Sequence, residues 1–284
     1  METRILGRTG LKVNCFAFGG ILLRGMEQSA ANRAVAQAIE RHINYFDVAP
    51  SYGDAQNLLG PALAPYRADV VLACKTVERT KDGAAKELRD SLSILQAEYF
   101  DIYQLHALDK PEEIETVFGP GGAMEALLEA RDAGLIRHIG FSAHSRQAAL
   151  TLLDRFDFDT VMFPLNYAYW LKGQAGPEVV KRAEERNMGC IAIKALAHRP
   201  WLPGERQGYP NCWYKPINDH PELADLALRF ILSQRVHVAI SPGDLEMLWL
   251  GAEIASRFQP ITDAETARLK AEADTHDHIF ADRY

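Results

Sequence analysis

Residues 44–53 read NYFDVAPSYG, a short apolar run that ends in the acid Asp47 and is soon followed by the phenol of Tyr52. The next two apolar runs end in a similar way, because VLACKT (71–76) carries Lys75 and IYQLH (102–106) closes with His106. Short apolar runs separated by helical stretches are typical of buried parallel strands. The carboxyl ends of such strands meet at one mouth of a barrel, so we expect these four polar side chains to lie together.

The same alternation of short apolar runs and amphipathic stretches continues along the chain. Strands are expected at 15–18, 45–47, 70–75, 102–105, 136–141, 160–163, 190–193 and 236–240. Helices are expected at 29–41, 84–95, 122–132, 146–155, 177–187, 221–233 and 245–254. Alternation of this kind predicts an α/β fold, the (β/α)8 TIM barrel. A barrel of roughly 250 residues would use nearly all of the 284 residues, so we expect residues 1–284 to form one domain.

The segment before the first barrel strand reads as a small β-hairpin. Residues 4–6 and 11–13 flank the turn GRTG (7–10), and such a hairpin could cap the bottom of the barrel. Ser29 is the expected N-cap of the first helix. Gly134 and Gly189 each follow a helix and precede a strand, where a left-handed backbone commonly reverses the chain.

Composition narrows the class of protein. The net charge is −7 and no block of Lys and Arg occurs, which disfavours a nucleic-acid or anionic-membrane partner. No apolar run approaches the roughly 18 residues of a membrane span, and the N-terminus lacks a signal-peptide core. The four cysteines form no C-x-x-C pair, so we expect a reduced, cytoplasmic protein.

The four polar residues at the strand ends suggest a particular chemistry. A tyrosine hydroxyl with an ordinary pKa of about 10 donates its proton poorly unless a cation stabilises the phenolate. Lys75 can be that cation, Asp47 can keep it charged, and His106 can donate a hydrogen bond to a carbonyl oxygen. Each residue alone is more often structural, but the conjunction favours a site that protonates a developing alkoxide.

The run Asp47-x-Ala49-x-x-Tyr52-Gly53, with Lys75 and His106 at the next two strand ends, resembles the aldo-keto reductases. The resemblance covers essentially the whole chain. It implies that NADP(H) or NAD(H) lies across the barrel mouth and exchanges hydride with an aldehyde, ketone or sugar carbonyl, or with the corresponding alcohol. Asp47, Tyr52, Lys75 and His106 would be the catalytic residues, with Tyr52 as general acid and base.

The resemblance also implies a set of cofactor-binding residues. Ser142, in GFS (140–142), resembles the ligand of the nicotinamide carboxamide. The remaining candidates close later strands or follow them, and they are Asn166, Lys194, Ser241, Gly243 and Glu246.

Two departures from the family pattern bear on the cofactor. Ala143 and then His144 follow Ser142 where the family usually has Asn, so one carboxamide contact is lost or supplied differently. After the eighth strand, Asp244 and Glu246 replace the usual basic residues, and a carboxylate repels a 2′-phosphate but accepts a hydrogen bond from a 2′-hydroxyl. This favours tolerance of NAD(H), unless Arg257 or another basic side chain folds back.

The sequence also bears on two other functions, a metal-dependent hydrolase and a cofactor-binding subunit or sensor. His144, His198 and His237 show no H-x-H or H-x-x-x-H spacing at a strand end, so we expect no metal and disfavour a metal-dependent hydrolase. A cofactor-binding subunit or sensor with little turnover is the second hypothesis. The aromatic stretch 198–221 either faces the substrate or packs on the barrel rim, and we favour a substrate role. The substrate, the oligomeric state and the direction of the reaction stay open.

Overall fold

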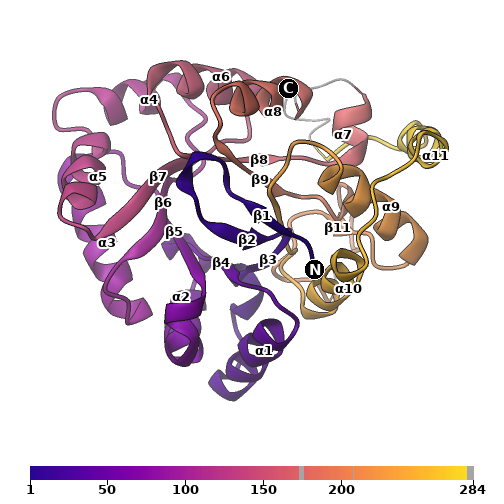
Figure 1. Cartoon of the computed structure of the whole chain (residues 1–284), viewed down its shortest axis with the longest axis horizontal. Coiled ribbons are helices and arrows are strands. Elements are labelled where there is room, and N and C mark those ends of the chain that lie inside the picture. The colour runs from indigo at the N-terminus through magenta and orange to yellow at the C-terminus, as the bar shows by residue number, and fades with distance from the viewer. Residues whose placement is uncertain (173–175, 207, 280–284) are drawn as a thin grey trace.

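The computed structural model of the chain describes residues 1–172, 176–206 and 208–279. Its centre is a closed barrel of eight parallel strands, in which β12 closes the ring between β9 and β3 (Figure 1). The barrel strands are β3 (Phe16–Gly19), β4 (Tyr45–Asp47), β5 (Val71–Thr76), β6 (Phe100–Leu105), β7 (Ile136–Ser142), β8 (Thr160–Pro164), β9 (Gly189–Ile193) and β12 (Val238–Ile240). The predicted TIM barrel is confirmed, and each expected strand overlaps an observed one.

Helices surround the barrel as an outer layer (Figure 1). They are α1 (Gln28–Glu40), α2 (Ala55–Leu63), α3 (Lys81–Leu95), α4 (Pro111–Phe118), α5 (Ala123–Asp132), α6 (Arg146–Arg155), α7 (Tyr167–Leu171), α8 (Gly176–Glu185), α9 (Pro221–Leu232), α10 (Leu245–Ser256) and α11 (Asp263–Ala273). Short 3-10 turns add η1 (Gly7–Thr9), η2 (Gly20–Leu23), η3 (Pro50–Tyr52) and η4 (Ala64–Asp69). The helices expected from periodicity bury apolar stripes in the core, as predicted, while α2, α4, α7 and α11 were not expected.

The hairpin expected at the N-terminus closes the floor of the barrel, the end opposite the mouth. Strands β1 (Thr3–Ile5) and β2 (Lys12–Asn14) pair antiparallel and cross the barrel centre in the view of Figure 1. The backbone N–H of Arg8 donates to the carbonyl of Asn187, which ties the hairpin turn to the segment before β9. Leu6 and Val13 are fully buried against the barrel interior, so the floor is sealed by apolar side chains.

Two of the expected helix-end residues are placed differently by the structure. Ser29 is not the N-cap of α1, because the helix begins at Gln28 and Glu27 occupies the N-cap position, two residues earlier. The side chain of Gln28 donates to Leu58 O in the first turn. Gly134 has the expected left-handed backbone, with φ 76°. Gly189 does not, since Asn187 takes the left-handed conformation with φ 51°. A Cβ on Gly189 would lie 2.7 Å from Leu6 Cγ, so its role is to let the hairpin approach β9.

Two apolar cores stabilise this arrangement. One fills the space between the strands and the helices, and the other lies inside the barrel around Ala17, Ile102 and Ile191. The inner core extends from the hairpin toward the mouth, and Asp47 and Lys75 stand at the mouth ends of their strands. The interior is therefore apolar at the floor and polar at the mouth.

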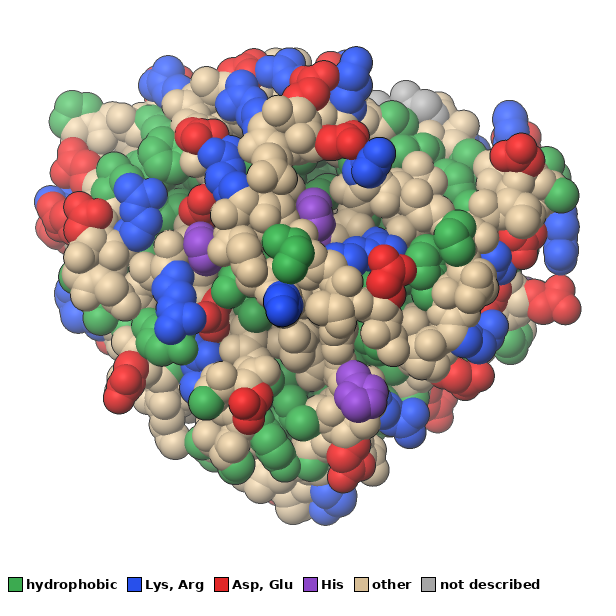
Figure 2. Space-filling view, in the orientation of Figure 1, with side chains coloured by type: hydrophobic (Ala, Val, Ile, Leu, Met, Phe, Trp, Pro, Cys, Tyr) green, Lys and Arg blue, Asp and Glu red, His purple; other side chains and the backbone are tan. Residues whose placement is uncertain are grey.

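The charged side chains of the surface are mixed in sign, and the cysteines are free thiols. On the face seen in Figure 2, acidic and basic side chains are interspersed. Among the described residues, no helix has the length and apolar character needed to cross a membrane. All four cysteines are buried free thiols.

Candidate active site

The deepest charged group at the mouth is Lys75 on β5, which is fully buried with 0% exposure. Its Nζ donates to Asp47 Oδ2 at 2.5 Å and lies 3.4 Å from the carbonyl of Val48. Neighbouring strands create this contact, because β4 and β5 are paired in parallel and their carboxyl ends converge. Asp47 Oδ1 has no hydrogen-bond partner among the described residues, so one oxygen of the pair is still available as an acceptor.

Tyr52 and His106 lie above this ion pair. Tyr52 ends the short turn η3, and its ring centroid is 5.3 Å from Lys75 Nζ. The His106 ring meets the Tyr52 ring edge-on, with centroids 5.8 Å apart, and Ser51 Oγ lies 3.4 Å from His106 Nδ1. The structure thus brings all four predicted catalytic residues together at the mouth.

Burial and mutual charge set the protonation of the four groups. Burial alone would lower the pKa of Lys75, but Asp47 and Tyr52 outweigh it and raise the pKa, so the ammonium stays charged. Burial raises the pKa of Tyr52, which the charge of Lys75 partly offsets, so the phenol is protonated at neutral pH. Burial and the Lys75 charge hold the pKa of His106 well below 6.5, so its imidazole is neutral.

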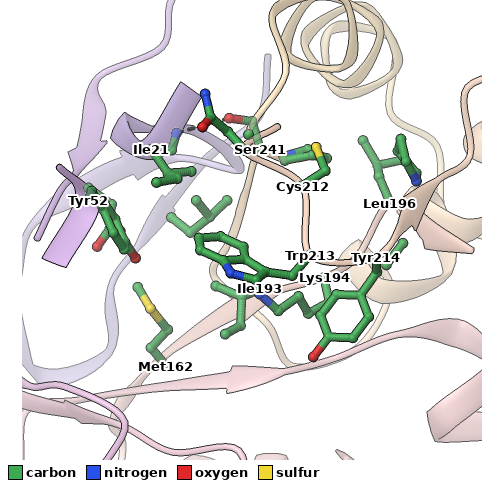
Figure 3. Close-up of a pocket in the computed structure, with 18 of the residues that line it drawn as sticks. Ile21, Tyr52, Met162, Ile193, Lys194, Leu196, Cys212, Trp213, Tyr214 and Ser241 are labelled. Atoms are coloured by element: carbon green, nitrogen blue, oxygen red, sulfur yellow. Dashed lines mark hydrogen bonds between the residues drawn. The ribbon is translucent and has the colours of Figure 1, made fainter. Parts of the chain in front are cut away.

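A cavity of about 430 Å³ opens over these residues. Tyr52, His106 and Asp47 line one part of it, and the opposite wall is formed by residues 211–214. Figure 3 shows Trp213 projecting into the middle of the cavity, between Tyr52 and Lys194. The Trp213 and Tyr52 ring centroids are 6.4 Å apart, so an aromatic side chain from a distant loop stands directly beside the phenol.

Four of the predicted cofactor residues line the cavity, and two do not. Ser142, Lys194, Ser241 and Gly243 are among its lining residues. Asn166 is fully buried and caps α7: its Oδ1 accepts from the Ala168 and Tyr169 N–H groups, and its Nδ2 donates to Ala197 O.

Glu246 is the second predicted residue outside the cavity lining. It is exposed in the first turn of α10, where Asp244 caps the helix by accepting from Met247 N at 3.0 Å. Arg257 does not fold back toward these carboxylates. Its guanidinium pairs instead with Asp225 at 2.8 Å, near the other end of the helix.

Lys194 has the geometry of a functional residue. Its φ of 69° is unusual for a side chain larger than glycine, and such strain persists mainly where surrounding structure imposes it. Its Nζ lies 5.2 Å from the Trp213 ring centroid and 5.3 Å from that of Tyr214. The aromatic wall therefore stabilises a cation inside the cavity through cation–π contacts.

One part of the stretch 198–221 lines the cavity and another part packs on itself at the rim. Residues 211–214 and Pro216 line the cavity. Trp201 and Tyr209 instead pack on each other, with ring centroids 5.7 Å apart, and Trp201 Nε1 donates to Cys212 O. Strands β10 (Ala197–Arg199) and β11 (Lys215–Pro216) pair and close the base of this loop.

Several lining residues were not among the predicted site residues, although the sequence marked their neighbourhood. His144 follows Ser142 and Ala143, at the position that departs from the family pattern. Asp109 accepts from the His144 backbone N–H and lies 3.2 Å from His144 Nδ1, which orients the ring at the cavity wall. Asn211 and Trp213 belong to the aromatic stretch 198–221, but this loop has no regular periodicity that would single them out within it.

Comparison with known proteins agrees with this geometry. Residues 16–272 match the family model described as "Aldo/keto reductase family". The aldo-keto reductase YhdN of Bacillus subtilis is 29% identical over 185 residues, covering 58% of this chain and 54% of that protein. L-galactose dehydrogenase of Arabidopsis thaliana is 28% identical over 214 residues, covering 69% of this chain and 66% of that protein. The matched part thus spans about half to two thirds of these relatives.

The fold has a counterpart among solved structures. The holo form of aldo-keto reductase AKR11C1 from Bacillus halodurans superposes with a TM-score of 0.75 at 23% identity, covering 99% of both chains. This similarity concerns the fold. The match to the family model over most of the sequence identifies the chain as a member of the aldo/keto reductase family, whose members are generally NAD(P)H-dependent carbonyl reductases.

Proposed function

We propose that the protein catalyses reversible, nicotinamide-dependent reduction of an aldehyde, ketone or sugar carbonyl, with Tyr52 as the general acid. The observation that carries this proposal is the fully buried Lys75–Asp47 ion pair directly beneath the Tyr52 ring. A buried charge of this kind is expensive to desolvate and adds little to stability, so its presence under a phenol at a cavity wall favours a catalytic role.

The four residues have different roles in the transfer of one proton to the substrate oxygen. A carbonyl oxygen that gains negative charge needs a donor in hydrogen-bond reach, and the protonated Tyr52 hydroxyl supplies it. Lys75 stabilises the phenolate that forms, while Asp47 keeps the ammonium in place. The neutral imidazole of His106 hydrogen-bonds the same oxygen without adding a charge that would compete for the proton.

The lining of the cavity fits a nicotinamide nucleotide, which supplies the hydride when it is bound. Ser142 Oγ accepts from Ala107 N at 2.8 Å, so its hydroxyl proton is free to point toward a carboxamide. Gly19 and Gly243 let three segments meet, since a Cβ there would lie 2.6 Å from Ser241 O and 2.1 Å from Asn211 O respectively. Lys194 is the cation best placed for a phosphate.

We further propose that NAD(H) is accepted alongside NADP(H). The N-terminus of α10 would ordinarily attract an anion, but Asp244 caps it and Glu246 adds a second carboxylate. Two basic residues, Arg24 and Arg206, line a hollow with Pro210 beside this region. These two arginines are the alternative groups that would bind the 2′-phosphate of NADP(H).

The wall of the cavity suggests a small, partly polar substrate. Trp213 is 49% exposed and offers a flat face, while Asn211 and His144 add polar groups. Relatives include proteins named L-galactose dehydrogenase and pyridoxal 4-dehydrogenase, whose names point to a sugar and an aromatic aldehyde. Both kinds of carbonyl suit a wall that combines an aromatic face with hydrogen-bonding groups.

Binding and turnover measured together test this function. NADPH and NADH are titrated in parallel by quenching of Trp fluorescence, and turnover is assayed on a panel of aldehydes, ketones and sugars. Tyr52→Phe should lower kcat by about 10²- to 10⁴-fold while leaving the cofactor Kd nearly unchanged. Tyr214→Phe, which removes another phenol of the same cavity, is the matched control and should keep most of the rate.

Three results would count against the proposal. Retention of most of the rate by Tyr52→Phe on every accepted carbonyl would show that Tyr52 is not the acid. Tight cofactor binding with slow turnover across the whole panel would favour a sensor or subunit. Failure to bind either nucleotide would remove the oxidoreductase assignment.

A further inference from the structure

A second cluster of titratable side chains lies away from the cavity, where the segment after α11 packs on β10. It consists of His198 on β10, Glu272 in α11 and His276, and their candidate ligand atoms all lie within 4.8 Å of one another. We propose that this cluster binds a Zn²⁺ ion, which fastens the segment 272–276 to the base of the cavity wall. No metal was expected, because His144, His198 and His237 show no metal-ligand spacing at a strand end, and this cluster joins His198 to two residues far along the chain.

The donor set suits zinc. Two imidazoles and one carboxylate form a common three-residue zinc site, with a fourth position open to water. Zinc bonds of about 2.0–2.2 Å place ligand atoms about 3.3–3.5 Å apart around a tetrahedral ion. His198 Nε2 already lies 3.6 Å from Glu272 Oε1, and the ligand atom of His276 lies within 4.8 Å of both. Hard cations such as Mg²⁺ prefer oxygen ligands and are poorly matched to this pair of imidazoles.

The surroundings differ for the two imidazoles. His198 is buried, and its Nδ1 has no hydrogen-bond partner among the described residues. Thr275 Oγ1 lies 3.2 Å from His276 Nδ1, a contact of the kind that orients a metal-ligating imidazole. The backbone of His276 is held by Lys172, whose Nζ donates to its carbonyl at 2.6 Å. The Tyr167 hydroxyl lies 3.3 Å from His276 Nε2 and is the contact that zinc would displace or adjoin.

The charges around the cluster also bear on metal binding. Lys215 is a nearby cation that would repel zinc, but it pairs with Asp219 at 2.8 Å. Glu272 supplies one carboxylate beside the two imidazoles.

The location gives the ion a structural role. His198 belongs to β10, whose pairing with β11 closes the loop that carries Trp213 and Tyr214. A zinc ion at this point would connect the end of α11 to that closure. It would therefore stabilise the cavity wall without touching the residues that handle the proton.

Zinc binding by the full chain, without a polyhistidine tag, tests the proposal. After dialysis against a chelator, calorimetric titration with ZnCl₂ should give one tight site per chain, and zinc should raise the Tm. His198→Ala and Glu272→Gln should each weaken the affinity at least about tenfold and remove the rise in Tm. His278→Ala is the matched control, since it removes a neighbouring histidine outside the cluster and should bind zinc as the wild type does.

The outcomes separate a zinc site from a hydrogen-bonded packing cluster. Equal zinc affinity in the wild type and in His198→Ala would place any binding elsewhere and overturn the proposal. Absence of binding at micromolar zinc would overturn it as well. Glu272→Gln preserves side-chain size at a half-buried position, so it reports on zinc even if His198→Ala fails to fold. Neither result depends on the proposed carbonyl reduction.

Discussion

The floor and the mouth of the barrel are built from the same strands, but the floor buries apolar groups and the mouth buries charged ones. At the floor, Leu6 and Val13 of the hairpin plug the interior with apolar groups. At the mouth, Lys75 and Asp47 are buried as an ion pair, and Asp47 Oδ1 has no partner among the described residues. The floor is arranged for stability, and the mouth retains costly polar groups that stability alone does not require.

The difference between the two ends locates function in this fold. The carboxyl ends of the strands carry titratable side chains that face an open cavity, whereas Leu6 and Val13 fill the interior at the floor. Substitutions at the mouth should therefore lower activity far more than comparable substitutions at the floor. Substitutions at the floor should lower stability while leaving the activity of the folded protein nearly unchanged.

The largest expected effect is at the mouth. Lys75→Met removes the ammonium and leaves Asp47 buried without its partner, which should destabilise the fold by about 3–5 kcal/mol. It should also lower kcat by at least about 10²-fold, because nothing then stabilises the Tyr52 phenolate. Urea unfolding and steady-state kinetics measure the two effects.

The double variant Asp47→Asn/Lys75→Met is the control for that change. It removes both charges and should recover much of the lost stability while staying inactive. Recovery of activity along with stability would contradict the role of the ion pair in catalysis.

At the floor, Leu6→Ala should destabilise the protein by about 2–5 kcal/mol, because it opens a cavity against the inner core. Its kcat per folded molecule should stay within about twofold of the wild type, since no proton-handling residue is touched. Unfolding curves and kinetics at a temperature where the variant is folded test this. A kcat loss like that of Lys75→Met would abolish the distinction between the two ends.

A pH titration of stability compares a histidine from each end. The pKa values of His106 at the mouth and His237 near the floor are both lowered, chiefly by burial. Below pH about 6.5 the unfolded chain binds a proton at each that the folded chain does not, so stability should fall as the pH falls. His106→Gln and His237→Gln should each reduce that slope by up to about 1.4 kcal/mol per pH unit. An unchanged slope would show that the histidine is already protonated when folded.

The smallest effect is expected at the rim of the mouth. Glu246→Gln removes one carboxylate from the first turn of α10 and should improve NADPH binding relative to NADH by about two- to fivefold. Arg206→Gln is the comparison variant. A selective loss of NADPH affinity there, with no change for Glu246→Gln, would place the 2′-phosphate beside Arg24 and Arg206 instead.

Much of the barrel was predictable because strands and helices leave periodic signals. Helix α2 was not predicted, since Gly60 and Pro61 both disfavour helix. The structure explains Gly60, because a Cβ there would lie 2.6 Å from Ile94 O in the neighbouring helix α3. A contact with a distant segment, invisible to local propensity, decided that element.

The sequence was enough to predict the barrel and the meeting of Asp47, Lys75 and His106, because parallel strands bring their carboxyl ends to one mouth. Tyr52 lies beyond its strand at the end of the turn η3, so its place near Lys75 also depends on that turn. Tertiary structure alone decided what surrounds them. It gave Asn166 to the cap of α7, placed Trp213 beside Tyr52, and joined His198 to Glu272 and His276. These placements depend on loops and on segments far apart in the chain, whose packing no local periodicity records.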